Sequence, residues 1–307
     1  SAHRRSIHAN LRCAAESRLG KSPLVAATSL LLSLGTASAF ASWNSTGGSI
    51  PDAAWTGDTP SIYYDRSVGV LAGEGGVSGG AATYSIPVTI VPGRAGMQPS
   101  VSLSYSSDGG NGIAGMGWSL TAGSAISRCG RSTAQDGLTD KVHFDKSKDR
   151  LCLNGQRLVS VSGIYGNSGA QYRTEFDSFV KVEQFGGDMD ATTTYFIVTR
   201  KNGTKEYFGD TADSRHSLDG ITQTSSWQIS KRTDPGGSNT ITWHYSALAN
   251  GEYTLDSIRY TGDGATSGDR YVTFEYESRP DTSVGYLSGG QFASTQRLAS
   301  ITTSYQS

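Results

Sequence analysis

Two glutamates separated by one residue, in Glu275-Tyr276-Glu277, form the pattern in this sequence that most resembles part of an enzyme active site. Alternate side chains of a β-strand point to the same face, so the two carboxylates would lie side by side. ADP-ribosyltransferases use such a pair with an upstream arginine and a Ser-Thr-Ser strand, and Arg215 and Thr224-Ser225-Ser226 lie upstream here. The same alternation, however, turns Phe274 and Tyr276 towards a core and both glutamates towards solvent. We therefore favour a structural strand and predict that the chain is not an enzyme.

Other patterns that suggest ligand binding are incomplete. The acidic stretches 188–190 and 263–269 could attract calcium, but neither completes an EF-hand loop. Gly73-x-Gly75 superficially resembles a nucleotide-binding loop, but no strand–helix context with a P-loop lysine follows it. We predict no cofactor, no metal site and no small-molecule substrate.

The chain has three cysteines, Cys13, Cys129 and Cys152. Cys13 lies in a segment that we expect to be removed, which leaves an even pair, and an even pair in an exported chain suggests a disulfide. Two free buried thiols remain an alternative. A zinc site with His143, which lies between the two cysteines, is another, although no CxxC or HxxxH spacing accompanies it. We predict a disulfide between Cys129 and Cys152.

Residues 1–41 have the layout of an export signal. Five basic residues and one acidic residue precede an apolar run at 24–34, and Ala37-Ser38-Ala39 and Ala39-Phe40-Ala41 both fit the small-x-small pattern of a cleavage site. The apolar run is shorter than the ~20 residues that a membrane span needs. A buried helix and an uncleaved anchor are the alternatives. We predict a signal peptide at 1–41 and an exported product, extracellular or on the cell surface.

Length and charge narrow the class of protein further. A chain of 307 residues is long enough for one large β domain or two smaller ones, each with a sizeable core. Without residues 1–41, the 26 basic and 27 acidic residues become 21 and 26, a formal net charge of −5. An acidic chain is a poor partner for DNA, RNA or anionic membranes. We therefore predict no nucleic-acid partner.

The remaining sequence alternates between strand-like runs and turns. Residues 42–80 are rich in Gly, Ser, Thr and Asp and are predicted to be a flexible lead-in. Strand-like runs follow at 84–91, 100–106 and 118–126, and the Asn-Gly pairs Asn154-Gly155 and Asn202-Gly203 predict two-residue hairpin turns. Asp234-Pro-Gly-Gly237 joins two further strands. The sequence predicts an all-β fold of many antiparallel hairpins.

The stretch 82–129 closely resembles the N-terminal domain of the Salmonella plasmid virulence protein B (SpvB) family, and weaker matches extend the resemblance to roughly 80–307. The same domain forms the N-terminal part of the B components of insecticidal toxin complexes and of many Rhs/YD-repeat proteins. We therefore place an SpvB-like N-terminal β domain at 81–307. The residues that carry the resemblance are Tyr84, Pro87, Pro92, Gly93, Arg94, Gly96, Pro99, Tyr105, Gly112, Gly117 and Trp118.

This resemblance implies a structural role. It predicts a non-catalytic domain of a secreted toxin or virulence protein, forming the opening part of an Rhs/toxin-complex B-type shell that encloses and delivers a toxic polypeptide. The implied partners are downstream Rhs or propeller segments or other toxin-complex subunits, and some family members reach the host cytoplasm. The transferase activity of the family belongs to a separate C-terminal domain that nothing here resembles. Residue 307 precedes the expected repeats, so we expect a fragment, a truncated product or a stand-alone module.

Two alternative functions remain. One is a secreted module that binds a surface glycan or protein through exposed tyrosines and Trp55, Trp227 and Trp243, although packing in a core is the usual role of such residues. The other is the ADP-ribosyltransferase considered above. The stretch 297–305 is strand-prone and lies at the very terminus, where the neighbouring strands of a wall would be missing. Residues 42–307 are therefore predicted to self-associate, and extending the chain past residue 307 is predicted to reduce this.

Overall fold

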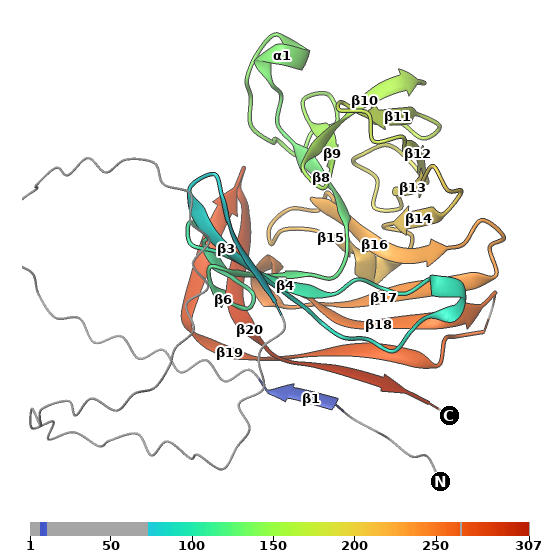
Figure 1. Ribbon diagram of the computed structural model, residues 1–307. Helices are drawn as coiled ribbons and strands as arrows, with labels where there is room; N and C mark the ends of the chain where they lie inside the picture. Colours follow the sequence, from blue (N-terminus) through green and yellow to red (C-terminus); the bar gives the residue numbers. More distant parts are fainter. Residues whose placement is uncertain (1–6, 11–72, 265, 307) are drawn as a thin grey trace, which may run out of the picture. The chain divides into compact units, whose positions relative to one another are not determined.

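A computed structural model describes residues 7–10, 73–264 and 266–306 (Figure 1). Their regular secondary structure is almost all antiparallel strand, which confirms the predicted all-β class. The short helix α1 (Thr133–Asp136) and three single-turn 3-10 helices connect them. In the part of the chain that the structure describes, no helix is long and apolar enough to cross a bilayer.

Eight strands form a closed barrel. Each strand pairs with the next along the chain, and the last returns to pair with the first through Trp227 and Ile126. Alternate residues are buried, including Phe196 on one strand and Phe208 on its neighbour, so side chains fill the interior. The strands are β8 (Ala125–Cys129), β9 (Arg150–Leu153), β10 (Gln156–Ser162), β11 (Gln171–Thr174), β12 (Lys181–Phe185), β13 (Tyr195–Thr199), β14 (Lys205–Phe208) and β16 (Ser226–Thr233).

Strand β16 also begins a second, open sheet. Its first half pairs with β8 and its second half with β17, so two strands diverge from one edge of β16 (Figure 1). The predicted β16–β17 hairpin is therefore present, with its turn at Asp234 and Gly237. The open sheet continues through β17 (Asn239–Ala247), β18 (Tyr253–Asp263), β19 (Arg270–Leu287) and β20 (Gly290–Tyr305), and β1 (Ile7–Asn10) pairs with β20.

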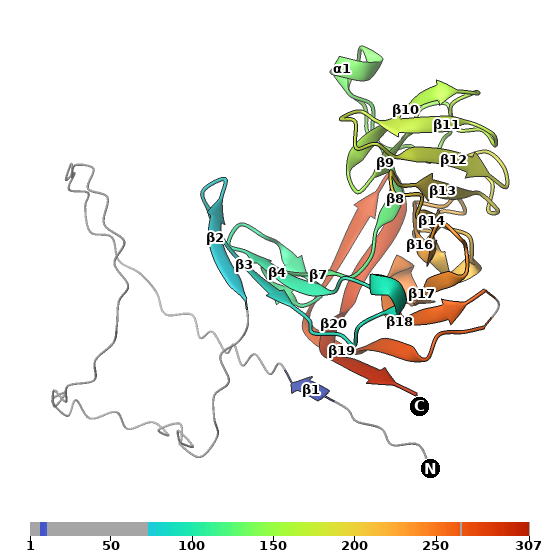
Figure 2. The ribbon, with the colours of Figure 1, turned by 45° about the vertical axis from the view of Figure 1, so that its right-hand side comes forward.

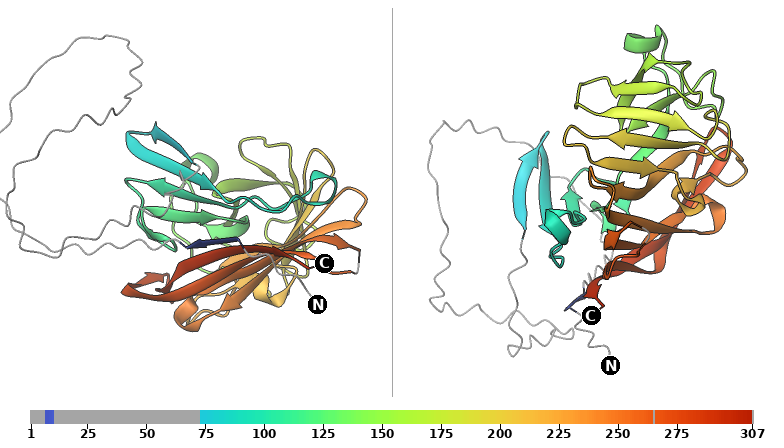
Figure 3. Two further views of the ribbon diagram at one scale, coloured as in Figure 1. Left: turned by 60° about the horizontal axis from the view of Figure 1, so that its bottom comes forward. Right: turned by 90° about the vertical axis from the view of Figure 1, so that its right-hand side faces the viewer.

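A smaller sheet packs against the open sheet (Figures 2 and 3). Its apolar row Ile86, Leu103 and Leu120 runs across neighbouring strands and joins the same core as Ile258 and Phe274 of the open sheet. The small sheet consists of β2 (Glu74–Ser78), β3 (Ala81–Pro87), β4 (Ser102–Ser106) and β7 (Trp118–Thr121), and a two-stranded ribbon of β5 (Asn111–Gly112) and β6 (Gly115–Met116) lies between β4 and β7 in the sequence.

Several predicted boundaries differ from the structure. The run 118–126 is two strands in different sheets, because the chain leaves the small sheet after Thr121 and enters the barrel at Ala125. Strand β2 lies in the glycine-rich segment 42–80, whose last part is therefore a strand rather than a linker. Asn154-Gly155 makes the predicted two-residue turn, whereas the loop at Asn202-Gly203 runs from 200 to 204 and only Gly203 has positive φ.

The predicted export signal lies mostly outside the described residues, as do its apolar run, its cleavage sites and Trp55. Only β1 of that segment is described, and it pairs with 300–303 of β20. In the full chain the predicted terminal edge is therefore paired over these residues.

Candidate functional site

An aromatic row on the small sheet is where the residues of the family motif meet. Tyr84 lies opposite Tyr105, and Tyr105 lies opposite Trp118, so the three side chains lie in line across β3, β4 and β7. The ring centroids of Tyr105 and Trp118 are 5.3 Å apart. All three are half-buried, because the row continues the apolar face of the sheet beyond its packed core.

Glycines let the neighbouring loop 109–117 approach this row closely. A Cβ on Gly117 would lie 2.5 Å from the Tyr105 ring, and one on Gly112 would lie 2.0 Å from the Trp118 carbonyl oxygen. Gly117 also has φ +75°, which favours glycine. The loop and the row enclose a groove of about 560 Å³. Its lining includes Glu74, Thr83, Tyr84, Ser104, Tyr105, Ser106, Asn111 and Trp118.

The other motif residues belong mainly to the loop 92–99, which holds the small sheet on the open sheet. The Arg94 guanidinium donates hydrogen bonds to the carbonyl oxygens of Ser238 (3.2 Å) and Gly262 (2.7 Å), and it lies 3.4 Å from the Asp263 carboxylate. Asn239 returns a hydrogen bond to the Arg94 carbonyl oxygen. Pro92, Gly93, Gly96 and Pro99 shape this loop, while Pro87 ends β3.

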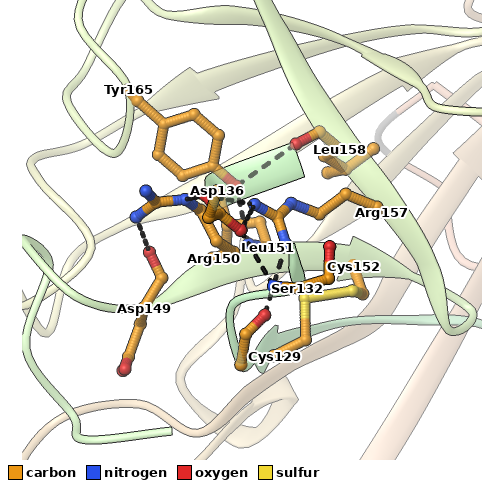
Figure 4. Close-up of a disulfide and its surroundings, with 11 residues drawn as sticks. Cys129, Ser132, Asp136, Asp149, Arg150, Leu151, Cys152, Arg157, Leu158 and Tyr165 are labelled. Atoms are coloured by element: carbon orange, nitrogen blue, oxygen red, sulfur yellow. Dashed lines mark hydrogen bonds and ion pairs between the residues drawn. A yellow bond between two sulfur atoms is a disulfide. The ribbon is translucent and has the colours of Figure 1, made fainter. Parts of the chain in front are cut away.

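The structure joins Cys129 and Cys152 in a disulfide with a Cα–Cα distance of 6.0 Å (Figure 4). The two residues lie on the paired barrel strands β8 and β9. Beside the disulfide, the Asp136 carboxylate accepts hydrogen bonds from Arg150 (2.8 Å), Arg157 (2.7 Å) and the Ser132 amide (3.0 Å). The disulfide and this carboxylate together fix the loop that carries α1 onto the barrel.

Asp136→Asn is expected to destabilise the protein near neutral pH and to lose its effect in acid. Burial alone would raise the pKa of Asp136, but hydrogen bonds from Arg157, Ser132 and Arg150 outweigh it and lower the pKa to about 2. A lowered folded-state pKa gives stability that is present above the unfolded value near 3.8 and is lost as the pH falls towards about 2. In urea unfolding, the difference between wild type and variant should shrink by about 2 kcal/mol between pH 5 and pH 2. A pH-independent difference would contradict this assignment.

Arg128 is a buried cation whose hydrogen bonds connect the barrel to three loops. Its guanidinium donates hydrogen bonds to the Thr224 carbonyl oxygen (2.7 Å), the Asp149 carboxylate (3.0 Å) and Asp190 (2.9 Å), and also to the Met189 carbonyl oxygen. The side chains of Arg128 and Asp149 are 1% and 0% exposed. The sequence analysis missed Arg128, although it lies two residues after the buried Ile126 and therefore on the same inward face of β8.

A second pocket, of about 490 Å³, lies where β8 and β17 diverge from β16. Three tyrosines line it: Tyr245 donates a hydrogen bond to the Ile229 carbonyl oxygen, Tyr276 donates one to the Leu255 carbonyl oxygen, and the Tyr253 oxygen accepts one from Gln228. Burial raises the pKa of all three hydroxyls above the usual range. They stay neutral and act as packing groups.

The residues of the possible transferase pattern are not brought together. Glu275 and Glu277 are exposed and accept hydrogen bonds from Ser300 and Arg297 of β20. Arg215 lies on β15 (Arg215–His216), which pairs with β16, and β17 and β18 separate β16 from the strand of the two glutamates. Its guanidinium donates a hydrogen bond to the Gly209 carbonyl oxygen.

The acidic stretches have partners of their own within the protein. Asp188 pairs with Lys146, and Asp190 pairs with Arg128. Among the described residues, no cluster of three or more His, Cys, Asp or Glu side chains could hold a metal ion. Trp227 and Trp243 are 0% and 2% exposed, so both belong to the core rather than to a surface platform.

Comparison with known proteins places this fold among bacterial virulence proteins. A family model described as SpvB, Salmonella virulence plasmid 65kDa B protein, matches residues 76–273. Proteins named mono(ADP-ribosyl)transferase SpvB from Salmonella typhimurium and Salmonella dublin are each 28% identical over 207 residues, covering 63% of this chain and 34% of the relative. The chain thus spans about a third of the length of these relatives.

Solved structures share the fold at lower sequence identity. A TcdB2-TccC3 structure matches with TM-score 0.63 and 19% identity, covering 76% of this chain and 14% of that one. The N-terminal domain of effector protein SpvB from Salmonella typhimurium strain LT2 matches with TM-score 0.56 and 18% identity, covering 69% of this chain and 86% of that one.

Proposed function

The chain belongs to the SpvB family, and on that basis we propose that it is a non-catalytic structural domain of a secreted toxin or virulence protein. In this role it contributes to the wall of a shell that encloses and delivers a toxic polypeptide. The observation that carries the proposal is the likeness to TcdB2-TccC3, in which the matched region is 14% of a much longer chain. The partners would be Rhs or propeller segments or other toxin-complex subunits.

The filled barrel and the open sheet support a role of the domain as part of the wall of a shell. Side chains fill the barrel, so a polypeptide cargo would lie against the domain rather than pass through it. The open sheet continues to β20, whose outer edge pairs with β1 over residues 300–303. Much of its outer edge is already engaged by other groups of the chain: the Glu252 carboxylate accepts the amides of Thr295 and Gln296, and the Ile113 carbonyl oxygen accepts that of Leu298.

Electron microscopy of the full gene product tests this proposal. We expect a hollow particle whose wall includes the barrel and the open sheet. A solid particle of the size of this domain alone would contradict a shell, and so would a reading frame around residues 1–307 that encodes no further β-rich segment.

We expect the isolated chain not to consume NAD. The exposed Glu275 and Glu277 lie on β19, and strands β17 and β18 separate β19 from β16, with which the strand of Arg215 pairs. Glu277→Gln should leave NAD turnover at background, and it should change the free energy of unfolding by no more than about 0.5 kcal/mol, as for surface substitutions in general. The measurement is NAD consumption by wild type and variant. Turnover that Glu277→Gln abolishes in a folded protein would restore the transferase interpretation.

Residues 42–307 alone are expected to self-associate more than residues 1–307. If the export signal is removed, β1 is removed with it, and the backbone of 300–303 on β20 loses its antiparallel neighbour. Unpaired strand edges recruit other chains. Light scattering on both chains at matched concentration measures the difference. A stable monomer of 42–307 would show that the domain closes its own edge, which would favour a stand-alone binding module.

A further inference from the structure

We propose that the pocket at the divergence of β8 and β17 from β16 binds an uncharged, extended peptide segment that inserts an apolar side chain. This inference does not depend on the shell proposal, because it rests on the lining of the pocket alone. The pocket has a volume of about 490 Å³ and lies where the two strands leave β16 (Figure 1). Sites that hold small ligands have volumes of about 300–1,000 Å³.

One wall of the pocket is the inward face of the open sheet. Tyr245 lies opposite Leu255 on the neighbouring strand, and Tyr253 precedes Leu255 by two residues, so the three side chains share one face. Tyr276 of β19 and Leu120 of the small sheet extend this apolar lining. Leu120, Leu255 and Tyr276 are half-buried against the main core. The pocket is therefore an unfilled end of the core, which favours an apolar occupant.

The opposite wall is formed by β8 and β16. Ala125 lies opposite Gln228, so their side chains share the face that points out of the barrel. Gln228 is 8% exposed, and its Nε2 donates hydrogen bonds to the Tyr253 hydroxyl (2.9 Å) and to Ser226 (3.0 Å). Its Oε1 accepts no hydrogen bond from any described residue. An amide oxygen in so buried a side chain gains free energy from a ligand N–H.

Two further groups beside Ala125 have hydrogen-bonding capacity to spare. The Asn154 Oδ1 accepts hydrogen bonds from the Ser124 hydroxyl (2.8 Å) and the Ala125 amide (3.0 Å), which fixes the side chain and leaves Nδ2 without an acceptor among the described residues. Gly123, in the exposed connection between β7 and β8, makes no hydrogen bond through its N–H or C=O to another described residue. The lining thus offers an amide acceptor, an amide donor and a free peptide group.

These groups match the repeating N–H and C=O groups of an extended peptide. A peptide group carries both a donor and an acceptor, so it matches Gln228 in either orientation of the side-chain amide. None of the described residues that line the pocket is Asp, Glu, Lys, Arg or His, and burial raises the pKa of the three tyrosines, which stay neutral. A charged side chain would lose its hydration here without gaining a partner. The lining therefore selects an uncharged segment.

Ala125→Phe blocks the pocket from a strand position. Its ring would lie on the same face as Gln228, between the two walls, and aromatic residues are favoured in strands. Ala82→Phe is the matched control, since Ala82 is an exposed residue of β3 that does not line the pocket. Gln228→Met removes the amide and keeps an unbranched, flexible side chain. Circular dichroism establishes that each variant is folded.

The test is isothermal titration of the full chain with blocked pentapeptides that carry Leu, Phe, Glu or Lys at the centre and Ser or Gly elsewhere. We expect the Leu or the Phe peptide to bind at least about tenfold more tightly than the Glu and Lys peptides, a difference of about 1.4 kcal/mol. Ala125→Phe should weaken this binding at least about tenfold. Gln228→Met should weaken it about threefold or more, as expected for a lost hydrogen bond, and Ala82→Phe should leave it unchanged.

Comparison of the peptides uses wild type alone, so it does not depend on the folding of any variant. The proposal is overturned if neither apolar peptide binds, if the Glu or the Lys peptide binds as tightly, or if binding survives Ala125→Phe in a folded protein. N-acetylleucine amide has the same apolar group but fewer peptide groups for Gln228, Asn154 and Gly123. Equal affinity for this compound and for the Leu peptide would therefore also overturn the assignment of a peptide segment.

Discussion

Arg128→Met is expected to lower the free energy of unfolding by about 3–5 kcal/mol, because it leaves a buried carboxylate without its cation. Asp149 is 0% exposed and loses the ion pair at 3.0 Å. Its remaining hydrogen bonds, from the His143 and Asp145 amides, compensate only part of the charge. The carbonyl oxygens of Thr224 and Met189 lose a donor as well. Urea unfolding followed by tryptophan fluorescence measures the loss.

Arg297→Met is the matched control, since Arg297 also lies on a strand and pairs with a carboxylate. Its side chain is 41% exposed and that of its partner Glu277 is 52% exposed, so the expected cost is at most about 1 kcal/mol. Asp149→Asn combined with Arg128→Met should recover part of the loss, because the uncompensated charge is then removed. Equal losses for Arg128→Met and Arg297→Met would contradict the buried network.

Local patterns predicted the strands well, because hairpins are specified by neighbouring residues. Asn154-Gly155 allows two successive residues with positive φ, and the alternation in Val101, Leu103 and Tyr105 matches the buried face of the small sheet. The same kind of pattern did not predict that β16 pairs with both β8 and β17. Ser226 pairs with Ser127 about a hundred residues away, and nothing near β16 in the sequence encodes that partner.

The sequence identified individual residues of the candidate site, but it did not predict that they lie together. The motif contains Tyr84, Tyr105 and Trp118, but only the strand register shows that they lie in one row. Arg128 could have been found from strand alternation, since it shares a face with Ile126. Its partners Asp149 and Asp190 belong to distant loops, which local periodicity does not locate.

Replacing both cysteines, Cys129→Ala with Cys152→Ala, is expected to lower the free energy of unfolding by about 3 kcal/mol. The two residues are 23 apart in the sequence, so the cross-link mainly restricts the unfolded chain. Reducing wild type with dithiothreitol should reproduce the loss, and the same treatment should leave the double variant unchanged. Labelling of both thiols in denatured, unreduced wild type would contradict the bridge.

The disulfide and Asp136 restrain the same loop, so their contributions should not add. Asp136 lies between the two cysteines in the sequence and is held by Arg150 and Arg157 on the neighbouring strands β9 and β10. Once the bridge is removed, these hydrogen bonds and the β8–β9 pairing hold the loop closed. Asp136→Asn should therefore cost more in the cysteine-free protein than in wild type, by about 0.5 kcal/mol or more, which is the coupling expected of groups that act on the same backbone segment. Equal costs in the two backgrounds would show that the bridge and the carboxylate act independently.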